Sequence, residues 1–486
     1  MLFSSIPFLY YFLPAVVISY FLISWALEGA LRLFGVQEQK AKKAGLFTKN
    51  LILLLFSLVF YAWGEPLYVF LMIGTILMFW GTGWLIGVAK RQAWKRIWLI
   101  VSIVSSIGIL AVFKYADFFI ENVNALTGLN MTLLKLALPV GISFYTFQAL
   151  SYTIDVYRGD TEVQKDPVSF GAYVTLFPQL IAGPIVRYVD VARELKNRNH
   201  TWQNIALGLR RFFVGLGKKI ILADNFALLM QLFRDSNDQS VVFYWIYVVA
   251  FAFNIYFDFS GYSDMAIGLG KIFGFNFIEN FNYPYTSKSV AEFWRRWHMS
   301  LGSWFRDYIY IPLGGNRVGK LRWVFNTLVV WMLTGFWHGA SWNFILWGLL
   351  YAVCLMVEKW VPALQKLPGF FRHLYTLLVV AFGWVLFNAT DLSQLGTDLS
   401  GLLGLSGLPF ISPATLYYLR SFALILVLGI VGSTPIVRDT ANRLSNSRRL
   451  GAVTTVAEVI IMLGLLLVCT SYLVDGAFSP FLYFRF

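Results

Sequence analysis

Two of the four histidines lie in apolar, tryptophan-rich sequence, where an ionisable side chain is unusual. An imidazole inside a membrane is costly unless it faces a cavity or a partner, so such a residue marks a candidate functional site. A neutral imidazole, with an ordinary pKa of about 6.5, can take a proton from a hydroxyl group at neutral pH. We therefore predict that His338 and His298 are catalytic, with His338 as a general base. The alternative for His338 is a hydrogen-bonded residue in a helix-packing seam, because Gly335 and Gly339 flank it four residues apart.

The stretch 292–315, which contains His298, combines charged side chains with Trp, Phe and Tyr. On a helix, Glu292 meets Arg295 and Arg296 at i+3 and i+4, which allows an internal ion pair. A guanidinium stays charged and suits a phosphate or carboxylate group of a ligand. The alternative is an interfacial helix whose arginines extend to the lipid headgroups. The candidate donor-binding residues in this stretch and beside His338 are Arg295, Arg296, Trp297 and Trp337.

Two acidic residues in an apolar segment, Asp258 and Asp264, are further candidates for donor binding. Asn254, Asp258 and Tyr262 share one helical face at i+4 steps. Buried carboxylates need partners. The favoured interpretation is structural pairing with arginines or hydroxyl groups, and the rival is orientation of a catalytic histidine.

The sequence ends in a short aromatic segment, 479–486, that contains Tyr483. Such a segment is typical of an interfacial aromatic anchor. A tyrosine can also form a covalent intermediate when it is activated. Tyr483 is therefore a candidate third catalytic residue.

The composition indicates an integral membrane protein. The 486 residues are 58% hydrophobic and 13% charged, whereas soluble domains carry roughly 25% charged residues. Several apolar runs approach the roughly 20 residues that span a bilayer, and their pattern requires helices. The two distant cysteines and four scattered histidines argue against a disulfide framework and a metal site. The basic residues that give the net charge of +14 cluster in short loops, as in membrane proteins, so we expect no nucleic-acid partner.

The basic loops fix a predicted topology. If they are cytoplasmic, the N-terminus lies outside. The opening Met1–Ser5 has no basic residue and no small-residue cleavage site soon after it, so we expect the first helix to be retained and not removed as a signal peptide. Twelve crossings then return the C-terminus to the outside. The predicted spans are 6–30, 51–64, 67–88, 97–113, 132–156, 218–234, 241–270, 323–337, 341–358, 373–388, 414–435 and 453–473.

Two further apolar stretches, 168–186 and 293–313, have basic sequence on both sides. A single crossing of either would break the charge pattern, so we predict re-entrant or broken helices. The expected interruptions are at Pro178 and Gly183-Pro184 in the first stretch, and at Gly302 and Pro312 in the second. Irregular backbone at membrane depth is tolerated only beside protein or a water-filled cavity. The sequence therefore predicts one membrane domain over 1–486, with a cavity in its middle part.

The chain resembles the membrane-bound O-acyltransferases, in particular the bacterial branch that acetylates alginate and peptidoglycan. The resemblance runs nearly end to end and rests on the combination of motifs more than on any single one. The motifs are the opening Met1–Ser5, Leu138–Phe144 with Ile154–Gly159, Leu180–Pro184, Tyr256–Ala266, 292–315, Trp337–Ala340 and Pro480–Phe484.

The resemblance implies a ring of about 11–13 transmembrane helices, with re-entrant helices around a central tunnel and a catalytic core at about 132–360. The near-invariant histidine of the family corresponds to His338, and a second functional position corresponds to His298. In a related D-alanylation system, a tyrosine in a similar C-terminal motif is the suggested acyl carrier, which by extension implies that role for Tyr483.

The resemblance also implies a bacterial cytoplasmic (inner) membrane protein that uses acetyl-CoA as donor substrate and holds no bound cofactor. The acetyl group passes outward, with a periplasmic SGNH-type or esterase-like partner, to a polysaccharide that the membrane protein itself need not contact. Alginate-like exopolysaccharide is favoured, with peptidoglycan as the alternative. A secondary transporter would also have broken helices and intramembrane charges, but no internal repeat is visible. A scaffold subunit of an export complex is a third hypothesis.

Overall fold

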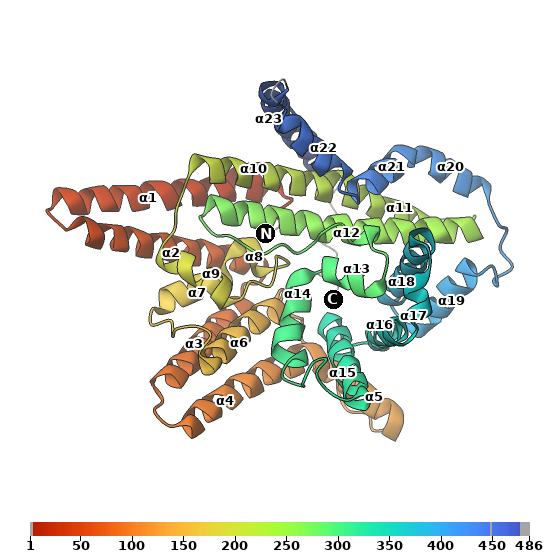
Figure 1. The fold of residues 1–486 in the computed structure, drawn as a ribbon, viewed down its shortest axis with the longest axis horizontal. Coiled ribbons are helices and arrows are strands. Elements are labelled where there is room, and N and C mark those ends of the chain that lie inside the picture. The colour runs from red at the N-terminus through yellow and green to blue at the C-terminus, as the bar shows by residue number, and fades with distance from the viewer. Residues whose placement is uncertain (1–2, 448–449, 477–486) are drawn as a thin grey trace. The chain divides into compact units, whose positions relative to one another are not determined.

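The computed structural model describes residues 3–447 and 450–476, and the regular structure of this part of the chain is helical (Figure 1). The predicted all-α class is therefore confirmed. The described chain forms two compact units: residues up to 212 together with 263–278, and residues 213–262 together with those from 279 onward. The single-domain interpretation of residues 1–486, with its core at about 132–360, stays a prediction.

The first unit contains the N-terminal helices. Helices α1 and α2 pack together, α2 also packs against α7, and α3 packs against both α4 and α6. Its elements are η1 (Pro7–Phe12), α1 (Leu13–Leu33), α2 (Glu38–Gly64), α3 (Tyr68–Val88), α4 (Gln92–Leu110), η2 (Ala111–Tyr115), α5 (Ala116–Thr127), α6 (Ile142–Arg158), α7 (Pro167–Thr175), α8 (Phe177–Leu180), α9 (Tyr188–Lys196), the first part of α10 (Trp202–Gly217) and the last part of α12 (Val241–Ile272).

The second unit contains the remaining parts of α10 and α12, both candidate histidines and a large buried aromatic core. Its other elements are η3 (Lys218–Ala223), α11 (Asp224–Asp235), η4 (Pro284–Thr286), α13 (Val290–Arg296), α14 (Met299–Phe305), η5 (Arg306–Tyr310), α15 (Lys320–His338), α16 (Trp342–Trp360), α17 (Pro362–Lys366), α18 (Gly369–Asn388), α19 (Leu392–Leu402), α20 (Pro413–Ser421), α21 (Ala423–Gly432), α22 (Ile436–Ser445) and α23 (Gly451–Val474).

Eight helical stretches of the described chain are long and apolar enough to cross a membrane, and the bent pair α20–α21 makes a ninth if it counts as one span. The eight stretches are Phe8–Leu33, α2, α3, Gln92–Thr127, α12, α16, α18 and α23. The predicted spans 132–156, 218–234 and 323–337 are not among them, and the count of 11–13 stays a prediction. The span 132–156 is wrong in its first part: residues 128–141 are not helical. Pro139 and Gly141, whose φ is +74°, delay the start of α6.

Both stretches predicted to be broken are interrupted in the structure. In the first, α7 ends at Thr175 and the four-residue α8 contains Pro178. In the second, the break lies at Trp297–His298, between α13 and α14, and not at the expected Gly302, which lies inside α14. His298 has a φ of +45°, in the left-handed region where a helix cannot continue. The expectation at Pro312 is closer, because η5 ends at Tyr310.

Helices α15 and α16 form a closely packed hairpin, joined by the three-residue loop Gly339–Ser341. A Cβ atom on Gly335 would collide with the backbone oxygen of Phe344, and one on Gly348 with that of Trp331. Small residues at these positions let the two backbones approach. The packing seam considered as the alternative beside His338 is therefore present, and it places His338 at the turn of the hairpin.

Candidate active site

The second unit encloses a cavity of about 980 Å³ that is lined by both candidate histidines. This volume lies at the upper end of the range of small-molecule sites, roughly 300–1,000 Å³. Helices α13, α14, α15 and α16 supply most of its wall. The predicted site residues in the wall are His298, His338, Arg295 and Trp297.

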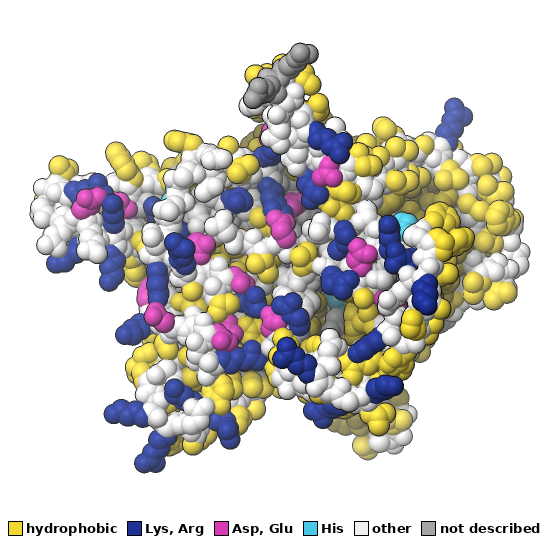
Figure 2. All heavy atoms as spheres, in the orientation of Figure 1, with side chains coloured by type: hydrophobic (Ala, Val, Ile, Leu, Met, Phe, Trp, Pro, Cys, Tyr) yellow, Lys and Arg dark blue, Asp and Glu magenta, His cyan; other side chains and the backbone are white. Residues whose placement is uncertain are grey.

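The cavity is basic where its wall is exposed, and aromatic and buried around the histidines. The basic residues of the wall are Lys288, Arg295, Arg306, Lys359 and Arg372. On the face shown in Figure 2, too, Lys and Arg are the commoner charged side chains, in keeping with the net charge of +14. A large anionic molecule with an apolar or neutral reactive end would match this gradient of polarity.

His338 is the last residue of α15 and is only 5% exposed. Its ring centroid lies 5.0 Å from that of Trp337, 5.1 Å from that of Trp347 and 5.1 Å from that of Phe387. These rings limit the access of water to the imidazole. The C-terminal end of a helix favours positive charge, so the position suits a residue that takes up a proton.

His298 is 2% exposed and lies at the break between α13 and α14. Its Nδ1 atom is 3.1 Å from Oδ1 of Asn280, and its ring centroid is 4.7 Å from that of Phe259. His298 belongs to none of the candidate membrane-spanning helices, and burial lowers its pKa to about 3, so the ring is neutral at physiological pH.

Trp337 lies between the two histidines. Its ring centroid is 5.8 Å from that of His298 and 5.0 Å from that of His338. Two residues 40 positions apart in the sequence thus share one aromatic neighbour and one cavity. Trp337 itself is not in the cavity wall.

The two candidate arginines differ in their surroundings. Arg295 is exposed and lines the cavity. Arg296 is 2.7 Å from the carboxylate of Glu292, as the predicted i,i+4 pair requires, and does not line the cavity. Only Arg295 is therefore placed to meet a ligand there, and the donor-binding role of Arg296 stays a prediction.

Asp258 and Asp264 lie outside the cavity wall and form ion pairs. Asp258 is 2.8 Å from Nζ of Lys219, which is also 2.8 Å from Asp224. In the first unit, Asp264 is 3.0 Å from Arg211. This geometry matches the favoured structural interpretation, with Lys219 where an arginine was expected for Asp258. Their predicted donor-binding role has no support from position, and Tyr483 lies outside the described residues.

Two residues that hold parts of the cavity wall in place could not be found from the sequence. Glu358, on α16, accepts hydrogen bonds from the backbone nitrogens of Val290 at 2.6 Å and Ala291 at 3.0 Å, and so anchors the start of α13. The motif Ser289-x-x-Glu292 indicates a helix start, but nothing in it points to a residue 68 positions away. The second of these residues is Asn280, whose side chain is the hydrogen-bond partner of His298.

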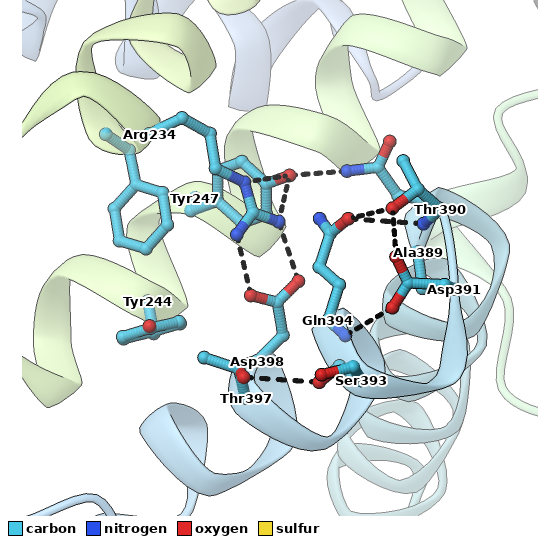
Figure 3. A network of polar contacts seen from close by, with 12 residues as sticks. Arg234, Tyr244, Tyr247, Ala389, Thr390, Asp391, Ser393, Gln394, Thr397 and Asp398 are labelled. Atoms are coloured by element: carbon cyan, nitrogen blue, oxygen red, sulfur yellow. Dashed lines mark hydrogen bonds and ion pairs between the residues drawn. The ribbon is translucent and has the colours of Figure 1, made fainter.

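A polar network holds the end of α18, whose Phe387 contacts His338. Arg234 forms a two-pronged pair with Asp398 at 2.8 and 2.6 Å and donates to the hydroxyl of Tyr247, as Figure 3 shows. The amide of Asn388, the last residue of α18, also donates to that hydroxyl. The network therefore ties α11, α12, α18 and α19 together beside the aromatic shell of His338.

Comparison with known proteins gives the same family as the motifs. The model of the membrane-bound O-acyltransferase family matches residues 164–395, which include both histidines. A probable alginate O-acetylase of Pseudomonas syringae pv. tomato is 40% identical, over 82% of this chain and 74% of that protein. The peptidoglycan O-acetyltransferase of Helicobacter pylori is 36% identical, over 84% and 80%. A teichoic acid D-alanyltransferase of Bacillus subtilis is 30% identical, over 51% and 67%.

These relatives share most of their length with the chain, and the resemblance seen in the motifs is confirmed. The apolar helices agree with a multi-pass membrane protein. The chain belongs to the membrane-bound O-acyltransferase family and is an acyltransferase.

Proposed function

We propose that this protein transfers an acetyl group from cytoplasmic acetyl-CoA across the bacterial cytoplasmic membrane, for O-acetylation of a polysaccharide outside. The observation that carries the proposal is the single cavity wall that combines exposed cations with two buried imidazoles. The names of the relatives support O-linked acyl transfer to envelope or secreted glycans.

The donor enters by its thioester end, and the basic wall holds its phosphates. Lys288, Arg306, Lys359 and Arg372 join Arg295 as candidates for this role. Nζ of Lys359 lies 3.6 Å from the ring centroid of Trp323, which also lines the cavity. The cations lie in or beside the basic loops, which makes this side cytoplasmic under the positive-inside rule and the N-terminus extracytoplasmic.

The transfer step needs one proton acceptor. His338 takes the proton of the attacking hydroxyl, and the hydroxyl oxygen forms a bond to the carbonyl carbon of the thioester. The carbon–sulfur bond breaks, and the thiolate leaves with the proton that His338 returns. His298 positions or polarises the thioester. In this proposal the protein binds no cofactor, and acetyl-CoA acts as a substrate.

The attacking hydroxyl belongs either to Tyr483 or to a partner of the SGNH or esterase-like kind outside the membrane. The final acceptor is an alginate-like exopolysaccharide, with peptidoglycan as the alternative. Relatives named for alginate and for peptidoglycan, at 40% and 36% identity, support these two acceptors in this order.

Purified protein incubated with acetyl-labelled CoA tests the reaction class. We expect the label to leave the thioester for a hydroxyl acceptor and free thiol to appear. A secondary transporter would move a solute and leave the thioester intact, and a scaffold subunit would do neither. Mass spectrometry of envelope glycans from cells with and without the protein then identifies the acceptor. Unchanged acetylation in all glycans would contradict the proposal.

A further inference from the structure

Helix α22 is an amphipathic helix between apolar ones, and it lies outside the candidate membrane-spanning stretches. It follows α21, the second half of the bent pair α20–α21, and it precedes the spanning helix α23. In Figure 1, α23 is seen nearly end-on, whereas α22 lies across the view. The axis of α22 therefore does not continue the direction in which α23 runs.

One side of α22 is apolar and is not covered by the protein. In a helix, residues at i, i+1, i+4, i+5 and i+8 share one side, and here these positions hold Ile436, Val437, Thr440, Ala441 and Leu444. Ile436 and Val437 are each 58% exposed, Leu444 is 40% exposed, and no residue of α22 is buried. Three large apolar side chains thus share one exposed side of a ten-residue helix.

Two arginines lie at the edges of this apolar side. With 3.6 residues per turn, Arg443 falls beside Ile436 at one edge, and Arg438 falls at the other edge. Asp439 and Asn442 lie on the opposite side of the helix. Arginines at such edges can lay their stems along apolar surface and keep their charges among lipid headgroups.

Arg438 also shows which way the helix faces. Its guanidinium lies 4.9 Å from the centroid of the Tyr283 ring, and its Nε is 3.1 Å from Oδ1 of Asp439. The side chain of Arg438 is nevertheless 53% exposed, and Arg443 is exposed as well. The edge with Arg438 therefore meets the protein at Tyr283, while the apolar side is turned away from this contact.

The place of α22 in the chain selects the lipid surface as the occupant of its apolar side. Only residues 433–435 separate α22 from α21, and only residues 446–450 separate it from α23. Three residues reach about 10 Å, so α22 stays close to the membrane boundary at which α21 ends. An acidic protein would match the arginines, but acyl chains are already present at this boundary and match the apolar side as well.

The charge of this connection adds a preference among lipids. Residues 436–450 contain four arginines and one aspartate. Anionic headgroups attract basic segments at a membrane surface, whereas zwitterionic headgroups do so much less. The surface therefore fits anionic phospholipids better than neutral ones.

We propose that α22 is an interfacial helix that binds anionic phospholipids, with its apolar side in the outer part of the acyl layer and with Arg438 and Arg443 at the headgroup phosphates. The topology of the proposed function assigns this surface to the cytoplasmic leaflet. No residue of α22 lines the cavity. The lipid contact can therefore hold or fail independently of acetyl transfer, and the experiments below need no assay of activity.

Two single cysteines test how deeply each side of α22 lies. Leu444→Cys is on the apolar side and Asn442→Cys on the opposite side, and both native residues are exposed. In full-length protein whose two native cysteines are replaced, each is labelled with the fluorophore NBD and reconstituted into vesicles of phosphatidylcholine and phosphatidylglycerol in equal amounts. Lipids brominated near the headgroup end of their acyl chains should quench the label at 444 several-fold more strongly than the label at 442.

Aqueous iodide provides the complementary measurement. It should quench the label at 442 more strongly than the label at 444, because the apolar side is shielded by lipid. Equal quenching of both labels by lipid, or stronger iodide quenching at 444, would overturn the proposal. That result would leave the apolar side to a protein partner.

The preference for anionic lipid is measured with the label at 444. In the same mixture, bromine is placed either on phosphatidylglycerol or on phosphatidylcholine. We expect brominated phosphatidylglycerol to quench about two- to fivefold more strongly, and this ratio should fall as salt rises. A ratio near one at low salt would refute the preference for anionic lipid.

Variants assign the ratio to the two arginines. Replacing both by glutamine, Arg438→Gln with Arg443→Gln, should bring the ratio close to one, whereas Arg438→Lys with Arg443→Lys should largely keep it. Lys366→Gln removes an exposed charge from another loop and should not change it. An unchanged ratio in the double glutamine variant would contradict the proposal.

A second measurement needs neither labels nor cysteine replacement. Native mass spectrometry compares the phosphatidylglycerol bound to the wild-type chain with that bound to the double glutamine variant. We expect the variant to retain less of this lipid and an equal amount of phosphatidylcholine. Equal retention of phosphatidylglycerol by both proteins would overturn the proposal, even if the cysteine-free protein does not fold.

Discussion

At the residue scale, the two imidazoles have different surroundings, and the roles proposed for them differ accordingly. His338 ends a helix among aromatic rings, and His298 is bound to Asn280 by Nδ1. One position suits a group that gains a proton, and the other suits a neutral ring. Both side chains line one cavity, so a single ligand could meet both of them there.

Among the basic residues of the cavity wall, Arg372 allows the clearest prediction about donor binding. Its Nε is buried and has no hydrogen-bond partner among the described residues, although the side chain lines the cavity. Because the half-buried side chain lines the cavity, its charged guanidinium is placed to meet a phosphate group of the donor. We expect Arg372→Gln to raise the KM for acetyl-CoA several-fold with little change in kcat.

Lys366→Gln is the matched control, because Lys366 is exposed and lies outside the cavity wall. Its KM should equal that of the wild type. Equal KM values for Arg372→Gln and the wild type would remove Arg372 from the donor site. Steady-state kinetics at two salt concentrations makes the measurement, since the phosphate contact should weaken as salt rises.

At the element scale, the α15–α16 hairpin depends on its small residues. A methyl group on Gly348 would collide with the backbone oxygen of Trp331 and push the helices apart. We expect Gly348→Ala to lower both the apparent melting temperature and acetyl transfer, because His338 lies at the turn of this hairpin. Gly396→Ala, where nothing lies within 4 Å of the added carbon, should leave both unchanged or raise the melting temperature slightly. Equal melting curves for the two variants would contradict this account.

A second prediction at this scale concerns the polar network of Arg234, Tyr247 and Asp398 shown in Figure 3. Asp398→Asn removes the charge that faces Arg234, while the side chain of Asp398 is only 5% exposed. Hydrogen bonds to charged groups contribute about 1.5–3 kcal/mol, so the variant should melt several degrees lower in detergent. Asp439→Asn breaks the exposed pair with Arg438, where the two side chains are 48% and 53% exposed, and should change the melting temperature little. A smaller loss for Asp398→Asn than for Asp439→Asn would refute the interpretation.

At the scale of the whole molecule, the proposed function predicts that the cavity opens to the cytoplasmic side of the membrane. The two native cysteines, Cys354 and Cys469, are first replaced. A single cysteine in place of Lys366 should then react with a membrane-impermeant maleimide only after the cytoplasmic membrane has been permeabilised. A cysteine in place of Gly407, in the connection between the predicted spans 373–388 and 414–435 that this topology places outside, should react in cells whose outer membrane alone has been permeabilised. Reaction of both from one side would contradict the predicted topology.

Much of the helical arrangement could be predicted from the sequence, because the local pattern of apolar, charged and small residues determines it. Apolar run length predicted the helical membrane fold, and Gly335 with Gly339 indicated a packing seam as the alternative role of this segment. The flanking charges predicted that 293–313 is broken, although the break is at His298 and not at Gly302. That position depends on the tertiary contact with Asn280, which no local pattern encodes.

The parts of the site that sequence did not reveal are contacts between distant segments. Phe387 meets His338 across 49 residues, and Glu358 reaches the start of α13 across about 68. The sequence offered Asp258 as a partner for a histidine or arginine, whereas the fold pairs it with Lys219. Such partners are chosen by packing in three dimensions, since any nearby residue of opposite charge satisfies a buried carboxylate.

The central claim is that the imidazole of His338 takes the proton of the acceptor in this cavity, and His338→Ala tests it most directly. The measurement is the rate of thioester cleavage in purified protein with acetyl-labelled CoA and a hydroxyl acceptor. His373→Ala, a half-buried histidine outside the cavity wall, is the control. We predict that His338→Ala folds and binds the donor but transfers acetyl groups about 10²- to 10⁴-fold more slowly, while His373→Ala stays near the wild-type rate. A wild-type rate for His338→Ala would contradict the account.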